Sequence, residues 1–331
     1  MRASTKRKVA LIGSDTLLGR EVRDVCATGD LPLDLELFTE VDEEAGRLTA
    51  QGDEPAILSP IRKERLTGAR AVVLAGAPDS ARSVLAMELG CPIIDVTHTA
   101  EDHPAARLRA PIVERDIPPL DANAVSLIAS PAAVTLALLI GRLHESCPIT
   151  RSVAHVFEPA SERGQKGLTE LQQQTASLLS FRSLPHEVYD TQAAFNMLAS
   201  FGEEAPESLE SIELRIERHL ASLLAGWRAP MPSLRLLQAP VFHGYTVSLW
   251  VEFAEPTRED EVAAALEGNR VELYGAGLEP PTNVRIAGQP EVAVGGIRRD
   301  RNQPRAFWLW AAADNLRLSA ENALAVAQEV V

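Results

Sequence analysis

The chain changes from a strand to a helix within the stretch Leu127-Ile-Ala-Ser-Pro-Ala-Ala-Val-Thr-Leu-Ala-Leu138. The apolar run from Val125 to Ala129 predicts a buried strand that ends at Ser130-Pro131. Because proline fixes φ and needs no N–H, it suits the first turn of a helix that has Ser130 as its N-cap. Helix N-termini lower the pKa of a thiol or hold an oxyanion. The junction is therefore the natural place to look for a nucleophile.

Length, composition and charge bound what surrounds this junction. A chain of 331 residues, 46% of them hydrophobic, can bury the cores of two ordinary domains. The net charge of −14 disfavours nucleic acid or an anionic membrane as a partner. We see neither a membrane-spanning apolar run nor a signal sequence, and the three cysteines form neither a disulfide framework nor a metal pattern. We therefore expect a cytoplasmic protein without a metal.

The first half of the chain alternates strand and helix patterns. Short apolar runs predict four buried strands, at Lys8–Gly13, Leu33–Phe38, Ala71–Ala75 and Cys91–Asp95. Between the first two, Leu17 to Val22 has helical spacing. This alternation predicts an α/β, Rossmann-like doubly wound domain with a parallel sheet.

Two glycines after the first strand suggest a dinucleotide site. The fingerprint of such sites would place glycines at Gly13, at position 16 and at Gly19. Thr16 takes the middle place, where a branched side chain should crowd the pyrophosphate. The other reading is a tight strand-to-helix turn that binds no ligand.

An acidic turn follows the second strand, where the ribose of a dinucleotide would lie. Thr39 is followed by Glu40, Asp42, Glu43 and Glu44. Carboxylates repel the 2′-phosphate of NADP and suit the bare ribose of NAD. If either nucleotide binds, we expect NAD rather than NADP; the alternative is a solvated acidic turn.

The strand-to-helix junction resembles the nucleophile turn of the aspartate-semialdehyde dehydrogenase family, Ala-Asn-Pro-Asn-Cys-Ser/Thr-Thr. In this resemblance Ser130 and Ala132 stand where the family has asparagines, and Ala133 stands where it has the catalytic cysteine. A methyl group cannot attack an aldehyde. The resemblance thus implies the family's fold without its nucleophile.

Two segments of the second half carry the same resemblance. Glu158 to Leu171 is similar to Gln-Ala-Val-Ser-Gly-Ala-Gly-Lys-x-Gly-x-x-Glu-Leu, with Glu158 in place of the glutamine that orients the acyl-enzyme. Leu236 to Phe253 is similar to Arg-Val-Pro-Val-x-x-Gly-His-Ser-x-x-Val-x-Val-Glu. There Gln238 and Tyr245 replace the arginine that binds the substrate carboxylate and the acid/base histidine. Glutamine carries no charge, and tyrosine, with a pKa of about 10, is a poor base at neutral pH.

Further substrate-binding positions also differ from the family. Val96 to Glu101 is similar to Asn-Ser/Thr-Ser-Ala-Phe-Arg, so Glu101 replaces the arginine that holds the substrate phosphate. The predicted helix Glu207–Leu224 is amphipathic, with one apolar face made by Leu209, Ile212, Ile216 and Leu220. In this helix Glu210 and Glu213 align with a glutamate and a lysine that touch substrate. Taken without the resemblance, this helix presents a solvated charged face.

The resemblance also implies a domain plan and a cofactor site. It divides the chain into a dinucleotide-binding-like domain over 1–128, with a helix over 314–331 packed back on it, and an α+β domain over 129–313. The mixed sheet of the second domain is expected to form a homodimer. A retained nucleotide would contact Gly13, Thr16, Leu17, Gly19, Thr39, Ala75, Gly76, Ser161 and Asn315.

Three hypotheses about function follow. The first is a catalytically silent paralogue of aspartate-semialdehyde dehydrogenase, a dimer that acts by binding or regulation in amino-acid biosynthesis. The second is an NAD(P)-dependent oxidoreductase for a different aldehyde or oxo group, with Tyr245 or His243 transferring the proton. His243 lies two residues before Tyr245, so on a strand the two would share one face. The third is the family's activity carried by another thiol, Cys147 or Cys91, although both positions suit a buried core residue better.

Overall fold

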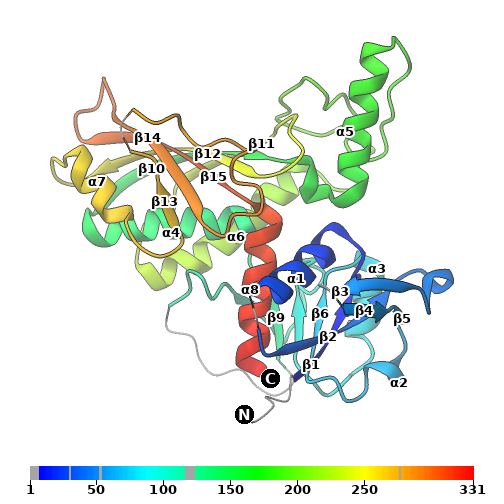
Figure 1. Ribbon diagram of the computed structural model, residues 1–331. Helices are drawn as coiled ribbons and strands as arrows, with labels where there is room; N and C mark the ends of the chain where they lie inside the picture. Colours follow the sequence, from blue (N-terminus) through cyan, green and yellow to red (C-terminus); the bar gives the residue numbers. More distant parts are fainter. Residues whose placement is uncertain (1–6, 30, 52–53, 116–123, 276) are drawn as a thin grey trace. The chain divides into compact units, whose positions relative to one another are not determined.

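The computed structural model describes residues 7–29, 31–51, 54–115, 124–275 and 277–331 (Figure 1). The chain forms two compact units, Met1–Ala129 with Leu316–Val331, and Ser130–Asn315. These boundaries lie one and two residues from those expected from the sequence. In the part of the chain described, no helix is both long and apolar enough to span a bilayer.

The first unit is built on a parallel sheet. Among the described residues it has seven strands in the order β5-β2-β1-β6-β7-β9-β8. Strands are added on both sides of β1, which is the arrangement of a doubly wound fold. The strands are β1 (Arg7–Ile12), β2 (Leu33–Thr39), β5 (Ser59–Pro60), β6 (Ala71–Leu74), β7 (Ile93–Asp95), β8 (Ala106–Arg109) and β9 (Val125–Ile128), with a separate hairpin of β3 (Leu48–Gln51) and β4 (Glu54–Ile57).

Helices cover both faces of this sheet. They are α1 (Leu17–Thr28), α2 (Lys63–Leu66), α3 (Pro78–Leu85) and α8 (Asn315–Val330), with a 3-10 turn η1 (Asp42–Glu44). Val9 and Leu11 of β1 pack in one cluster with residues of α1 and α8, while Ala10 and Ile12 pack in another with residues of α2 and α3. Burial on both faces explains the continuous apolar runs that predicted these strands. The predicted Rossmann-like fold is confirmed.

The second unit is built on a mixed sheet, as predicted. Its described residues give the order β11-β10-β12-β15-β14-β13, with parallel pairs at both ends and antiparallel pairs between them. The strands are β10 (Ile149–Glu158), β11 (Ser233–Gln238), β12 (Tyr245–Phe253), β13 (Val271–Leu273), β14 (Val292–Arg299) and β15 (Ala306–Ala313). The helices are α4 (Pro131–Ser146), α5 (Gly164–Leu179), α6 (Leu209–Trp227) and α7 (Glu259–Leu266), with a 3-10 turn η2 (Ala160–Arg163).

Helix α4 starts at the predicted junction and packs against α6. A Cβ on Gly141 would lie 2.3 Å from the Trp227 ring, so this glycine lets the two helices approach. The predicted apolar face of α6 is buried, with Leu209, Ile212, Ile216 and Leu220 in the core. The helix runs beyond the predicted end at Leu224, to Trp227.

Ser130 is the N-cap residue of α4, as predicted, although its side chain makes no capping hydrogen bond. Its backbone N–H instead donates to Nδ1 of His219, at 3.0 Å. Burial, together with Arg215 and Arg218, lowers the pKa of His219 to about 4. The imidazole is therefore neutral at physiological pH and can accept this hydrogen bond.

Candidate functional site

Strand register places three of the predicted site residues in one row. Glu158 at the end of β10 pairs with Gln238 at the end of β11. On the other side Phe157 pairs with Thr246, which sets Glu158 opposite Tyr245 at the start of β12. Neighbours across a ladder project from the same face of a sheet. The structure thus brings together Glu158, Gln238 and Tyr245, which lie up to 87 residues apart in the chain.

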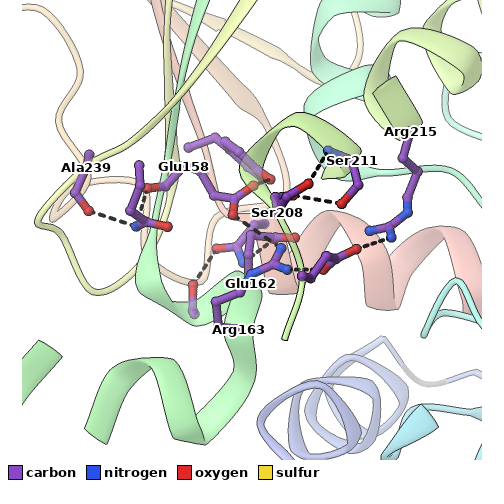
Figure 2. Close-up of polar contacts among 12 residues, drawn as sticks. Glu158, Glu162, Arg163, Ser208, Ser211, Arg215 and Ala239 are labelled. Carbon is purple, nitrogen blue, oxygen red and sulfur yellow. Dashed lines mark hydrogen bonds and ion pairs between the residues drawn. The ribbon is translucent and has the colours of Figure 1, made fainter. Parts of the chain in front are cut away.

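The residues of this row bond to one another (Figure 2). The Tyr245 hydroxyl donates to Oε2 of Glu158 at 3.1 Å. The Gln238 amide donates to the backbone carbonyls of Glu158 and Ala239, each at 2.9 Å. All three side chains are buried: Glu158 is 0% exposed, and Gln238 and Tyr245 are 1% exposed.

The negative charge of Glu158 in this row is balanced by an arginine that was not predicted as a site residue. Arg163, at the end of η2, lies with its guanidinium 3.2 Å from Oε1 of Glu158 and also donates to Glu207. Glu207 in turn accepts from Arg215 of α6 (Figure 2). The signal for Arg163 was its place in the Glu158–Leu171 motif, where the resembled family has alanine. Glu207 and Arg215 had no such signal.

Burial and charge set the protonation of the cluster. Burial raises the pKa of Glu158, against the opposing effect of Arg163, and burial together with Glu158 raises the pKa of Glu162 to about 7. Burial raises the pKa of Tyr245 well above its usual value, and the two glutamates add to this rise. Tyr245 is therefore a neutral phenol that donates a hydrogen bond.

Two predicted cofactor residues meet beside this row. The Oδ1 of Asn315 accepts from the Ser161 hydroxyl and from the Gly244 backbone N–H, both at 3.1 Å. Its Nδ2 donates to Glu162 at 2.7 Å. Ser161 and Asn315, both in the second unit, thus hold each other.

The candidate nucleophile positions differ in their surroundings. Ala133 is the third residue of α4 and is fully buried. His243 lies in the turn before β12, so the expectation that it shares a strand face with Tyr245 was wrong. Burial raises the pKa of Cys91, and burial and Glu261 raise that of Cys147. Neither thiol is activated by its surroundings. The described residues contain no group of His, Cys, Asp and Glu that could hold a metal ion.

The predicted substrate-binding glutamates belong to two different units of the chain. Glu101 lies in the loop after β7 of the first unit, and Glu210 is exposed on α6. Glu213 accepts from the backbone N–H of Leu236 at 2.6 Å, which ties α6 to the edge strand β11. This contact gives Glu213 a structural role.

The glycine-rich turn of the first unit is tight. Gly13 has φ +75°, and a Cβ on Gly19 would lie 2.1 Å from the Gly13 carbonyl oxygen. The Thr16 hydroxyl accepts from the Gly19 N–H at 3.0 Å and lies 2.7 Å from the Ala75 carbonyl. Its hydroxyl therefore caps α1 and faces β6. The predicted crowding of a pyrophosphate by Thr16 stays a prediction. Leu17, a further predicted contact, is the first residue of α1.

Glu40 lies across the segment that follows β6. Its Oε1 accepts from the Ala77 N–H at 2.6 Å, at the N-terminus of α3. A Cβ on Gly76 would lie 2.1 Å from the same oxygen, so a side chain there would displace the Glu40 carboxylate. Thr39, the last residue of β2, accepts from the Val41 N–H. This arrangement places a negative charge where β2 and β6 end.

The position of Glu40 predicts which of the two nucleotides, NADH or NADPH, binds more tightly. We expect NADH to bind more tightly than NADPH, and Glu40→Gln to improve NADPH affinity relative to NADH by at least about fivefold, because one like charge is removed. Calorimetric titration with both nucleotides measures this, with Glu64→Gln, at an exposed position of α2, as the matched control. Tighter binding of NADPH by the native protein would contradict the prediction.

The raised pKa of Glu162 predicts how the free energy of unfolding changes with pH. The folded protein holds this proton up to about pH 7, whereas the unfolded chain releases it near the ordinary value of 4.5. Unfolding therefore releases a proton between these values, and the free energy of unfolding falls as pH rises through them. All four tryptophans lie in the second unit, so their fluorescence during urea unfolding reports on it. We expect Glu162→Gln to reduce this fall and the exposed Glu255→Gln to leave it unchanged.

Comparisons with known proteins agree with this architecture. The family described as semialdehyde dehydrogenase, dimerisation domain, matches residues 140–318. Over 317 residues the chain is 27% identical to the USG-1 protein homolog of Pseudomonas aeruginosa, covering 94% of each. It is 25% identical to the aspartate-semialdehyde dehydrogenase of Rickettsia bellii, covering 98% of each. The structure of a probable aspartate-semialdehyde dehydrogenase from Pseudomonas aeruginosa superposes with a TM-score of 0.84 at 27% identity, covering 97% of each chain.

Proposed function

Since this chain belongs to the aspartate-semialdehyde dehydrogenase family, we propose that it is a catalytically degenerate member that acts by binding. Its role would be that of a binding or regulatory protein connected with amino-acid biosynthesis. The relatives named aspartate-semialdehyde dehydrogenase act on the aldehyde of that name, and this chain retains their fold.

One observation carries the proposal. Tyr245 and Glu158 stand where the resembled family has its acid/base histidine and its orienting glutamine, and here they bond to each other. Arg163 balances the charge of Glu158 from within the same unit. The raised pKa of Tyr245 keeps it from replacing the histidine as a base, and Ala133 supplies no thiol.

The alternative is an NAD(P)-dependent oxidoreductase with a different substrate. Such an enzyme needs a group that exchanges a proton near neutral pH. The raised pKa of Tyr245 makes it unsuited to this task, and His243 lies outside the row. Glu162, whose pKa is about 7, is partly buried beside Glu158 and already accepts a hydrogen bond from Asn315. We therefore place this reading second. A nucleotide, if bound, would contact the turn from Gly13 to Gly19 and the segment at Ala75 and Gly76.

Activity and nucleotide binding together test the proposal. An assay with aspartate semialdehyde, phosphate and either NAD⁺ or NADP⁺ should show no turnover above background. Robust turnover by the native protein would contradict the degenerate reading. Turnover of other aldehydes, together with tight NADH binding, would favour the oxidoreductase.

We also propose that the protein is a homodimer. Trp250 of β12 pairs with Trp308 of β15, and both indoles donate to Asp300 at 2.9 Å while remaining partly exposed. Their neighbours Leu249 and Val251 are buried on the opposite face of the sheet. This partly exposed aromatic face lies in the segment that matches the dimerisation domain.

Two apolar stretches of the second unit, Leu168–Leu179 and Trp250–Phe253, are expected to be covered in the dimer. Leu168, Leu171 and Phe253 are already buried within the protomer, so the apolar side chains left to cover include Leu179, Trp250 and its strand partner Trp308. We expect light scattering at micromolar concentration to give the mass of two chains, and Trp308→Glu to shift it towards one. A monomeric native protein would contradict this prediction.

A further inference from the structure

Three buried acceptor atoms near the paired row have no hydrogen-bond donor among the described residues. They are Oε1 of Glu158, Oε1 of Gln238 and the Tyr189 hydroxyl oxygen. Glu158 Oε1 lies near the Arg163 guanidinium but accepts no hydrogen bond from it. Tyr189, like Glu158, is 0% exposed. A buried acceptor without a donor costs free energy, so these atoms call for a donor from outside the chain.

The three atoms belong to one neighbourhood. Glu158 and Gln238 are ladder partners and project from the same face of the sheet. The Tyr189 hydroxyl and the Arg163 side chain both lie beside Gly167. A Cβ added to this glycine would be 3.0 Å from the tyrosine hydroxyl and 2.5 Å from Cβ of Arg163. Arg163 in turn pairs with Glu158 (Figure 2).

The charges around these acceptors select the kind of donor. Three carboxylates, of Glu158, Glu162 and Glu207, face two guanidinium groups, of Arg163 and Arg215. While Glu162 holds its proton, the other two carboxylates balance the two guanidinium groups, and once Glu162 is ionised the cluster has one negative charge in excess. At no stage is the cluster positive, so its charges favour a cation over an anion. Gln238 is uncharged, so unlike an arginine at this position it does not attract a carboxylate group of a ligand.

The Arg163 side chain also requires a hydrogen-bond acceptor from the ligand. Its Nε has no acceptor among the described residues, although its charge is matched by Glu158 and Glu207. A neutral oxygen, such as a hydroxyl, would satisfy this N–H without adding a second anion to the cluster.

We propose that this cluster binds a small primary ammonium compound that carries a hydroxyl group and lacks a carboxylate. The ammonium donates to Glu158, Gln238 and Tyr189, and the hydroxyl accepts from Arg163. No bond is made or broken. This inference rests on the proposed function, since it names the ligand class of a member that binds without catalysis.

Ethanolamine and choline form a matched pair of probes. Both carry a positive charge and a hydroxyl, but choline has no N–H to donate. At equal concentration and ionic strength, we expect ethanolamine to raise the midpoint of thermal unfolding of the second unit, followed by tryptophan fluorescence, and choline to leave it unchanged. Glycine, which adds a carboxylate to the ammonium, should bind more weakly than ethanolamine.

Variants locate the site. Glu158→Gln should weaken ethanolamine binding at least about tenfold, because a hydrogen bond to a charged acceptor is lost. The exposed Glu255→Gln, which removes one negative charge from the same unit, should bind as the native protein does. Tyr189→Phe should also weaken binding, which keeps the test open if Glu158→Gln does not fold.

Either of two results would overturn the inference. Equal responses to ethanolamine and choline would mean that water satisfies these acceptors, and unchanged binding by both Glu158→Gln and Tyr189→Phe would place the ligand elsewhere. The proposed function fails on a different readout, turnover of aspartate semialdehyde by the native protein, so the two failures are distinguishable.

Discussion

No NADPH or NADH is expected to form when the native protein is mixed with aspartate semialdehyde, phosphate and NADP⁺ or NAD⁺ at neutral pH. Loss of a nucleophile in a site whose residues act as a unit costs on the order of 10⁶-fold in rate. Ala133→Cys should restore little of this, because the new thiol would still lack the phosphate anchor, the carboxylate anchor and the acid/base. The positions concerned hold Glu101, Gln238 and Tyr245.

The variant series separates the thiol from its partners. Ala132→Cys places a thiol one residue earlier in the same buried turn and is the matched control. The smallest combination with a prospect of activity is Ala133→Cys, Gln238→Arg, Tyr245→His and Glu101→Arg. An aspartate-semialdehyde dehydrogenase with the complete set of residues serves as the positive control. Turnover by Ala133→Cys well above that of Ala132→Cys would show that the remaining site is still competent.

Replacing Arg163 with methionine is expected to cost about 3 to 5 kcal/mol of unfolding free energy, since it leaves a buried carboxylate unpaired. Glu207 keeps Arg215 as a partner, so Glu158, 0% exposed, is the carboxylate left without a cation. The Arg163 side chain is itself only 13% exposed, which limits compensation by water. The loss should shrink towards acid pH, because a protonated Glu158 carries no charge.

Urea unfolding followed by tryptophan fluorescence measures this change in the second unit. The exposed Lys166→Met removes a cation three residues further along the chain and should alter stability by no more than about 0.5 kcal/mol. The double variant Arg163→Met with Glu158→Gln should recover much of the loss, because no buried charge then remains unmatched. Equal stability of Arg163→Met and Lys166→Met would mean that the pair with Glu158 contributes nothing.

The fold could be predicted from the sequence because its signals are local. An apolar run such as Val125 to Ala129 is buried on both faces of a parallel sheet, so it shows no alternation and is recognised by its length. The break at Ser130-Pro131 follows from the fixed φ of proline. The helix spacing from Leu209 to Leu220 likewise marked the buried face of α6.

The sequence identified several residues of the candidate site but not the hydrogen bonds between them. Glu158, Gln238 and Tyr245 could be named because each lies in a stretch similar to a known motif. The residues around Tyr245 in the sequence do not indicate that its hydroxyl donates to Glu158, since this hydrogen bond depends on β12 lying beside β10. His243 was misplaced for a related reason: the start of β12 at Tyr245 was not apparent from the residue pattern.

The sequence by itself determined the two-unit α/β plan, the apolar faces and the absence of a thiol at residue 133, which is an alanine, because periodicity, proline and side-chain chemistry are properties of neighbouring residues. Only the tertiary structure decided that Arg163 balances Glu158 and Glu207, and that Glu40 bonds to Ala77. These contacts join segments that are distant along the chain, or turn a side chain towards one partner among several. Strand order and packing, rather than local propensity, choose between such partners.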